Sequence, residues 1–312
     1  MPKAIREVYG TALAELGDTN ENIVVLDADL SGSTKTAIFK KAHPERHFNM
    51  GIAEANMVAT AAGMSTVGKI PFVNTFTVFL TSLGLLSARD QICYANLNVK
   101  FGGAYCGMSD ALDGASHHAT EDMAIMRALP NMRVLVPADA VSTRWVTKFA
   151  VENYGPMYLR LSREAYPDLY AEDAVFECGR GNIVREGSDV TVIACGIMVH
   201  KALEAAELMA AKGVSVRVVD MYSIKPIDSE LILRCAKETG AIVCAEEHNI
   251  FGGLGSAVSE VLAYGGAGAP TEFVGIRDVF TESGPYKELL NKYGLDAEGV
   301  VEGIEKVLAR KK

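Results

Sequence analysis

The sequence predicts an α/β protein of two domains, each built on a mainly parallel sheet flanked by helices. Its 312 residues exceed the roughly 100–200 residues of one typical domain. Short β-branched runs alternate with helical patterns in both halves, as in parallel sheets covered by helices. Residues 166–187, rich in Gly and acidic residues, predict a linker between a domain at 1–165 and a domain at 188–312.

The first half begins with helical spacing over residues 4–16. Helical patterns also cover residues 53–66 and 140–152. The strands predicted between them are Ile23–Leu26, Ile70–Val73, Val99–Phe101, Val134–Val136 and Tyr158–Leu161. Because ligands bind at the carboxyl ends of parallel strands, we expect a site at that edge.

The second half shows the same alternation more plainly. Its predicted strands are Val190–Cys195, Val214–Val219, Ile242–Ala245 and Thr271–Ile276. Helical patterns cover residues 198–212, 228–239 and 253–263. This rhythm predicts a second parallel sheet.

Composition narrows the class of protein. The hydrophobic share of 49% and the charged share of 22% are ordinary for a soluble globular chain. The formal net charge of −9 disfavours nucleic acid and anionic membranes as partners. The six cysteines form no CxxC pair and are expected as buried free thiols. The N-terminal residues lack an apolar signal core, so we expect a cytoplasmic protein.

The segment FNMGIAEANM, residues 48–57, places Glu54 at the start of a predicted helix. An acid there can simply complement the helix dipole. The aromatic pair Phe76 and Phe79 follows a strand, and it can be core packing or a platform for a flat heterocycle.

The loop Asp113-Gly114-Ala115-Ser116-His117-His118 lies between a strand and a helix. Its Asp and Ser can be turn and cap residues. Two adjacent imidazoles also suit general acid–base chemistry.

Two features of the second half allow other interpretations. The turn Gly252–Ser256 follows a strand and precedes a helix, but it does not match the G-x-G-x-x-G pattern of nucleotide sites. The run Glu246-Glu247-His248 has metal-binding composition, although a structural or interfacial role is favoured.

Six motifs together resemble the transketolase family in order and spacing. They are DADLSGSTKT (27–36), FNMGIAEANM (48–57), PFVNTFTVF (71–79), DGASHH (113–118), PNMRVLVPAD (130–139) and EEHNIFGGLGSAV (246–258). The resemblance covers nearly the whole chain. It corresponds to the pyrimidine-binding and C-terminal domains, as in the smaller subunit of split transketolases.

The resemblance implies a thiamine diphosphate site. It gives Glu54 the role of the carboxyl that hydrogen-bonds the aminopyrimidine and so promotes loss of the thiazolium C2 proton. Phe76 and Phe79 match the aromatics that hold the aminopyrimidine, and Asp29 and Ile52 are expected beside the cofactor.

The resemblance also implies a substrate site. His117 and Asp113 match residues that meet the sugar hydroxyls and assist proton transfer. Arg6, Ser33 and Arg163 match positions that hold the terminal phosphate, a task suited to Arg. By position, Tyr105 and His118 are expected to contact substrate as well.

The sequence departs from the family pattern in places that concern the sugar. Ala104-Tyr105 replaces a frequent Thr-His pair, Leu112 replaces a frequent Glu, and His118 replaces a frequent Gln. These changes leave cofactor activation plausible and allow a non-standard anionic ketose as substrate.

The family's Gly-Asp-Gly run, which binds Mg²⁺ and through it the diphosphate, does not occur in this sequence. We therefore expect an N-terminal partner subunit to hold Mg²⁺, in an α2β2 heterotetramer that acts on sugar phosphates. No metal ligands are assigned to this chain.

The function implied is transfer of a two-carbon ketol unit from a ketose phosphate to an aldose. The alternatives are a beta subunit of a 2-oxoacid dehydrogenase decarboxylase component, a 1-deoxyxylulose-5-phosphate synthase-like enzyme, and a non-catalytic subunit. The Asp113–His117 loop and the Arg/Ser phosphate positions favour transketolase.

Overall fold

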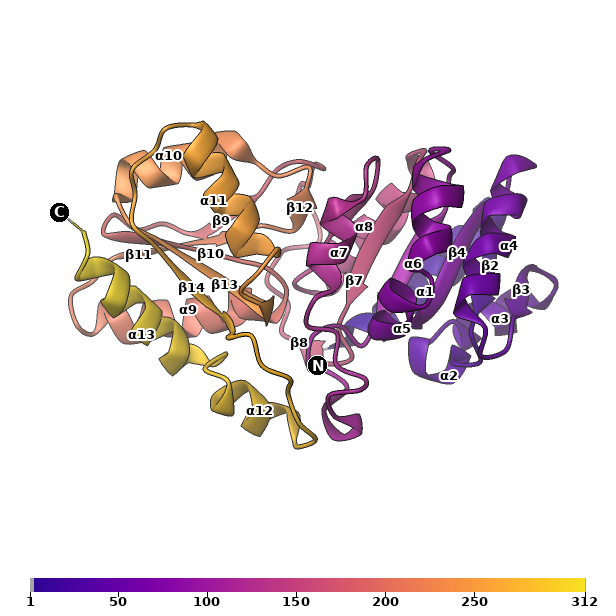
Figure 1. The fold of residues 1–312 in the computed structure, drawn as a ribbon, viewed down its shortest axis with the longest axis horizontal. Coiled ribbons are helices and arrows are strands. Elements are labelled where there is room, and N and C mark those ends of the chain that lie inside the picture. Colours follow the sequence, from indigo (N-terminus) through magenta and orange to yellow (C-terminus); the bar gives the residue numbers. More distant parts are fainter. Residues whose placement is uncertain (1–2, 312) are drawn as a thin grey trace.

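The computed structural model describes residues 3–311 and contains two sheets flanked by helices, side by side (Figure 1). Residues 1, 2 and 312, which belong to the expected domain ranges, lie outside the described residues. The predicted fold class is confirmed.

The first sheet has seven strands in the order β12-β6-β7-β5-β4-β2-β3. Their bounds are β2 Ile23–Asp27, β3 His47–Asn49, β4 Ile70–Phe76, β5 Lys100–Ala104, β6 Arg133–Leu135, β7 Met157–Leu161 and β12 Ser223–Lys225. All pair in parallel except β12. Strands β2, β5 and β7 are buried along their whole length, and β2 accordingly reads as a nearly continuous apolar run.

Helices cover both faces of this sheet. Helices α1 (Ile5–Thr19) and α8 (Ala140–Glu152) pack on one face. Helices α4 (Glu54–Thr66) and α7 (Asp122–Ala128) cover the other face with the π-helical turn Ala88–Cys93. Short helices at the edges are α2 Ser31–Thr34, α3 Ala37–Ala42, α5 Thr77–Ser82 and α6 Leu85–Ser87, with 3-10 turns at Pro44–Arg46 and Ala111–Asp113.

The second sheet has five strands in the order β14-β13-β10-β11-β9. Their bounds are β9 Asn182–Arg185, β10 Val190–Ala194, β11 Val216–Asp220, β13 Ile242–Asn249 and β14 Thr271–Ile276. Helices α9 (Ile197–Ala210) and α13 (Ala297–Leu308) pack on one face. Helices α10 (Ser229–Thr239) and α11 (Leu254–Tyr264) pack on the other, and α12 (Tyr286–Lys292) lies at one end.

Three features of the fold were not predicted by the sequence pattern. Strand β9 lies inside the expected linker and forms the antiparallel edge of the second sheet. Strand β12 comes from the second half but pairs with β6 of the first sheet. A third element, the two-residue ribbon of β1 (Lys3–Ala4) and β8 (Ala165–Tyr166), ties the start of the chain to the end of β7.

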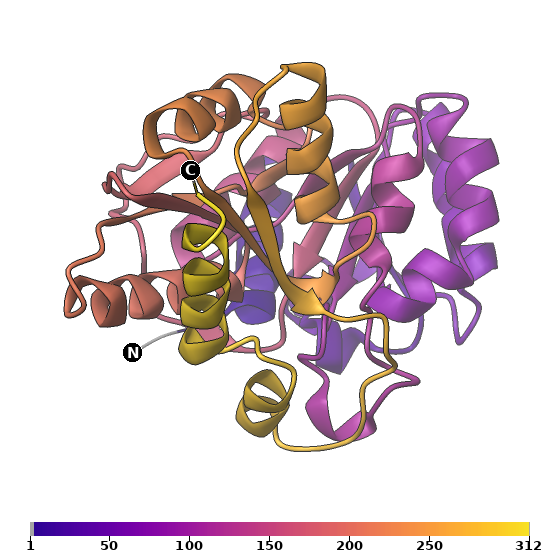
Figure 2. The same ribbon diagram turned by 60° about the vertical axis from the view of Figure 1, so that its left-hand side comes forward.

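The chain between β14 and α12 passes beside the loop that joins β5 to α7. Both views show this (Figures 1 and 2), and the Gly284 amide donates to the Ala111 carbonyl at 3.4 Å. The second domain therefore reaches the edge of the first sheet where ligands are expected.

Candidate functional site

Several predicted site residues lie at or just beyond the carboxyl ends of adjacent parallel strands. Asp29 follows β2, Phe76 ends β4, Tyr105 follows β5 and Arg163 follows β7. Glu54 begins α4, a few residues after β3 ends at the same edge. The sheet order therefore gathers residues that are far apart in the sequence.

Four aromatic rings meet at this edge. The Phe76 and Phe79 rings stack with centroids 6.1 Å apart. The Tyr105 ring packs on Phe76 at 4.3 Å, and the His117 imidazole meets Phe79 edge-on at 5.2 Å. The structure thus brings the predicted aromatic pair and the predicted imidazole together in one cluster.

Glu54 is buried at the first turn of α4, with only 4% of the residue exposed. Among residues 3–311, no side-chain hydrogen bond engages its carboxylate. The partly positive helix end accounts for an acid here. A carboxylate with free acceptor sites on a largely buried residue is also what recognition of a polar ring nitrogen requires.

Asp29 is exposed and has a left-handed backbone, with φ of 62°. Asn49, at the end of β3, fixes this turn: its side-chain amide donates to Asp29 Oδ1 at 2.8 Å, and its Oδ1 accepts from the Asp29 amide at 3.1 Å. Sequence reasoning missed Asn49, although it lies inside the motif that carries Glu54. Ile52 is 83% exposed beside this turn.

Two guanidinium groups converge on Tyr105. The Arg6 guanidinium carbon lies 4.9 Å from the centre of the Tyr105 ring, and that of Arg163 lies 5.6 Å away. Arg6 also donates to the Tyr105 hydroxyl and, at 2.8 Å, to the Ser33 carbonyl. The β1–β8 ribbon explains the meeting, because the Ile5 amide donates to the Glu164 carbonyl at 3.1 Å.

Asp113 is exposed at the end of a 3-10 turn in the histidine-bearing loop. Its neighbour Asp110, which sequence reasoning missed, is 3% exposed. Burial, with Asp113 as the next cause, raises the pKa of Asp110 to about 6. The only sequence signal was its closeness to Asp113.

His118 is packed inside the loop, and its predicted contact with the substrate stays a prediction. It is 3% exposed, with Nδ1 2.7 Å from Thr281 Oγ1 and Nε2 3.2 Å from the Ala111 carbonyl. Burial lowers its pKa, so the neutral imidazole is favoured. Both ring nitrogens are therefore engaged within the chain.

The glycine turn before α11 binds the chain's own carboxylate. The amides of Leu254 and Gly255 donate to Glu246 at 2.7 and 2.8 Å, so Glu246 occupies the helix N-terminus where a phosphate would bind in a nucleotide site. Among residues 3–311, no three His, Cys, Asp or Glu side chains are grouped to hold a metal ion.

All six cysteines are free, and five of them are buried, as expected. No helix within residues 3–311 is both long and apolar enough to span a membrane.

Comparisons with known proteins give consistent matches. The family model for the transketolase pyrimidine-binding domain matches residues 1–168, and that for the transketolase C-terminal domain matches residues 179–300. A transketolase C-terminal section from Methanocaldococcus jannaschii is 46% identical, over 97% of this chain and 95% of that protein. A 6-deoxy-6-sulfo-D-fructose transketolase subunit from a Clostridium species is 39% identical, over 98% and 95%.

Among solved structures, a split-gene transketolase described as an inactive beta4 tetramer superposes with a TM-score of 0.91. It is 52% identical, and each chain covers 100% of the other.

Proposed function

This chain belongs to the transketolase family, and we propose that it is the C-terminal subunit of a split, thiamine-diphosphate-dependent transketolase. It transfers a two-carbon ketol unit from a ketose phosphate, or a related anionic ketose, to an aldose. The observation that carries the proposal is the buried residue Glu54, whose carboxylate is unpaired, at the same sheet edge as the stacked Phe76 and Phe79 rings.

The residues present suit the aminopyrimidine half of thiamine diphosphate. Glu54 offers an unpaired acceptor on a largely buried residue, and Phe76 and Phe79 offer apolar faces for a flat ring. Asp29 and Ile52 lie in loops at the same edge. When bound, the cofactor supplies the carbanion that carries the two-carbon unit.

The remaining residues suit a sugar with an anionic end. Arg6 and Arg163 present two guanidinium groups around Tyr105, and Ser33 orients Arg6 through its carbonyl. His117 and Asp113 lie on the loop above the aromatic cluster and would exchange protons with the sugar hydroxyls.

We propose that an N-terminal subunit completes the site and holds Mg²⁺ with the diphosphate, in an α2β2 heterotetramer. The lack of a Gly-Asp-Gly run supports this. Exposed apolar side chains near the site supply a surface for the partner: Ile52 is 83%, Leu83 56% and Leu86 69% exposed. The tetrameric split-gene relative also favours an oligomer.

The anionic group at the end of the sugar can be a phosphate or a sulfonate in this proposal. The Clostridium relative is described as acting on a sulfonated fructose, and sulfonate and phosphate both suit paired guanidinium groups. Tyr105 at a position where the family often has His supports a non-standard ketose. The matched relatives are transketolases, which disfavours a 2-oxoacid dehydrogenase component.

The test is Glu54→Ala in the chain co-expressed with its N-terminal partner. Without the carboxylate, thiamine-dependent ketol transfer should fall at least about 100-fold, in the range expected for loss of an acid–base group. Activity would be measured over ketose phosphates and a sulfonated ketose.

The matched control is Glu298→Ala, which removes an exposed acid from the first turn of α13. It should keep wild-type activity. Full activity in Glu54→Ala, or no ketol transfer by the wild-type assembly with any donor, would contradict the proposed function.

A further inference from the structure

The loop from Cys106 to Ala119, called the histidine loop below, carries Asp113 and His117. We infer that the C-terminal domain acts in catalysis by positioning this loop, through Thr281, Ser283 and Glu247. The inference rests on the proposed function, and it gives the second domain a role that its distance from the aromatic cluster does not suggest.

The first contact acts on the residue next to His117. Thr281, in the segment after β14, lies 2.7 Å from His118 Nδ1 and is itself buried. The other ring nitrogen of His118 lies 3.2 Å from the Ala111 carbonyl. His118 thus bridges the C-terminal domain and the far side of its own loop. Because His117 is the adjacent residue, its backbone is fixed by this bridge.

The second contact acts next to Asp113. The Ser283 hydroxyl donates to the Leu112 carbonyl, and the Gly284 amide donates to the Ala111 carbonyl at 3.4 Å. A Cβ on Gly114 would lie 3.3 Å from the Ser283 amide nitrogen, so the two backbones are in close contact. The residues on both sides of Asp113 therefore touch the segment 283–284.

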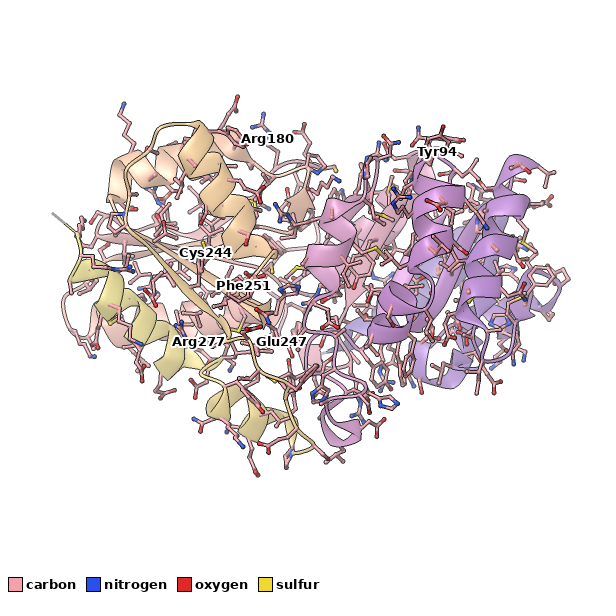
Figure 3. All side chains as sticks on the ribbon, viewed as in Figure 1. Tyr94, Arg180, Cys244, Glu247, Phe251 and Arg277 are labelled. Atoms are coloured by element: carbon pink, nitrogen blue, oxygen red, sulfur yellow. The ribbon has the colours of Figure 1, made fainter. Side chains whose placement is uncertain are left out.

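The third contact holds the beginning of the loop. Glu247, at the boundary between the domains (Figure 3), accepts from the Met108 amide at 2.7 Å. A Cβ on Gly107 would lie 2.4 Å from the Glu247 carboxyl carbon, so only glycine fits there. Glu247 is 2% exposed, which makes this contact strong and hard to replace by water.

The loop backbone needs such support. Ala111 in the loop and Tyr105 just before it have left-handed φ angles of 55° and 60°, which non-glycine residues adopt only when surrounding contacts impose them. Met108 and Ala111 are buried in the hydrophobic core of the C-terminal domain, not in that of the first domain. The loop is therefore covalently part of the first domain but packed as part of the second.

The two domains therefore position different parts of the proposed site. The sheet of the first domain places Phe76 and Tyr105, the residue before the loop, whereas the C-terminal domain holds the loop itself at Met108, beside Asp113 and at His118. Because small misplacement of a reacting group lowers the rate steeply, Thr281 and Ser283 should influence turnover without touching the substrate.

The experiment compares Thr281→Val, Thr281→Ser and Ser283→Ala with Thr191→Val in the full chain assembled with its partner. Thr191 is a matched control because it is a buried threonine of the same domain whose hydroxyl bonds Thr239 at 2.9 Å, away from the loop. Thr281→Val should lower kcat at least about tenfold with little change in KM for the donor sugar. Thr281→Ser, which keeps the hydroxyl, should restore most of the rate.

A second readout is independent of activity. Amide hydrogen exchange of residues 106–119, measured on the chain, should speed up in Thr281→Val and Ser283→Ala but not in Thr191→Val. Unchanged exchange and kcat in both loop variants, or equal losses in Thr281→Val and Thr191→Val, would overturn the inference. If the wild-type assembly lacks ketol transfer but the exchange pattern holds, the proposed function fails while the positioning contact stands.

Discussion

At the scale of single residues, Tyr105 distinguishes this site. Its ring packs on Phe76 while two guanidinium groups lie near its face, and its hydroxyl accepts from Arg6. A neutral phenol therefore stands between the platform proposed for the cofactor and the cations proposed for the substrate tail. Its hydroxyl helps to orient Arg6 toward the site.

Tyr105→Phe should test this orienting role. Removing the hydroxyl takes away one acceptor of Arg6, and hydrogen bonds to charged groups contribute about 1.5–3 kcal/mol when buried. Since Arg6 is partly exposed, we expect KM for the anionic donor to rise about tenfold with kcat nearly unchanged. Steady-state kinetics measure the split.

The control for Tyr105→Phe is Tyr264→Phe, because Tyr264 is 94% exposed on the second domain. It should leave both constants unchanged. A fall in kcat at constant KM in Tyr105→Phe would instead place the hydroxyl in the chemical step.

At the scale of elements, strand β13 carries two adjacent buried carboxylates that bind different parts of the chain. Glu246 binds the start of α11, and Glu247 binds the histidine loop. Burial raises the pKa of Glu247 from 4.5 to about 7, although the nearby Arg160 guanidinium opposes the shift. Both carboxylates face backbone amides, which accounts for this acidic pair without a metal.

The raised pKa of Glu247 predicts how the stability of the folded chain changes with pH. A carboxyl whose pKa is higher when folded contributes stability that is complete below its unfolded pKa of about 4.5 and is lost as pH rises through about 7. In Glu247→Gln this loss is absent. The free energy of unfolding of Glu247→Gln, minus that of wild type, should therefore increase by about 2 kcal/mol as pH rises from 5.5 to 8.5.

Denaturant unfolding of the full chain at both pH values measures this difference. Glu298→Gln, an exposed change on α13, is the control for the substitution itself. A difference between Glu247→Gln and wild type that stays constant, or that shrinks as pH rises, would contradict the assigned ionisation.

At the scale of the whole molecule, the two sheets do not form separate units. Strand β12 crosses back to pair with β6, and one hydrophobic core contains Val134 of the first sheet together with Ile193 of the second. Cutting the chain at the expected linker would therefore expose apolar surface on both sides. The rigid frame also explains how segment 281–284 can hold a loop of the other domain.

The same scale yields a prediction about cofactor affinity. Because the proposed diphosphate and Mg²⁺ ligands belong to another polypeptide, the chain alone should bind thiamine diphosphate at least about 100-fold more weakly than the assembly. Calorimetric titration of thiamine diphosphate in the presence of Mg²⁺, into the chain alone and into the assembly with its partner, measures both affinities. Equal affinity for thiamine diphosphate in both samples would contradict the proposal that a partner subunit completes the site.

The sequence by itself determined much of the fold. Buried parallel strands read as apolar runs, so Ile23–Leu26 and Tyr158–Leu161 were predicted within a residue or two of β2 and β7. Glu54, Phe76 and Phe79 could be selected because their motifs occur in family order. The sheet edge that gathers them also follows from the parallel pattern.

Only the tertiary structure decided which segments cooperate across long separations. Strand β9 was hidden in a Gly-rich stretch, and β12 has three residues with no pattern of their own. The roles of His118, Thr281 and Glu247 depend on contacts between residues more than 100 positions apart. Local patterns carry no signal for such pairs, because they report what a residue does to its neighbours in sequence and not what folding brings beside it.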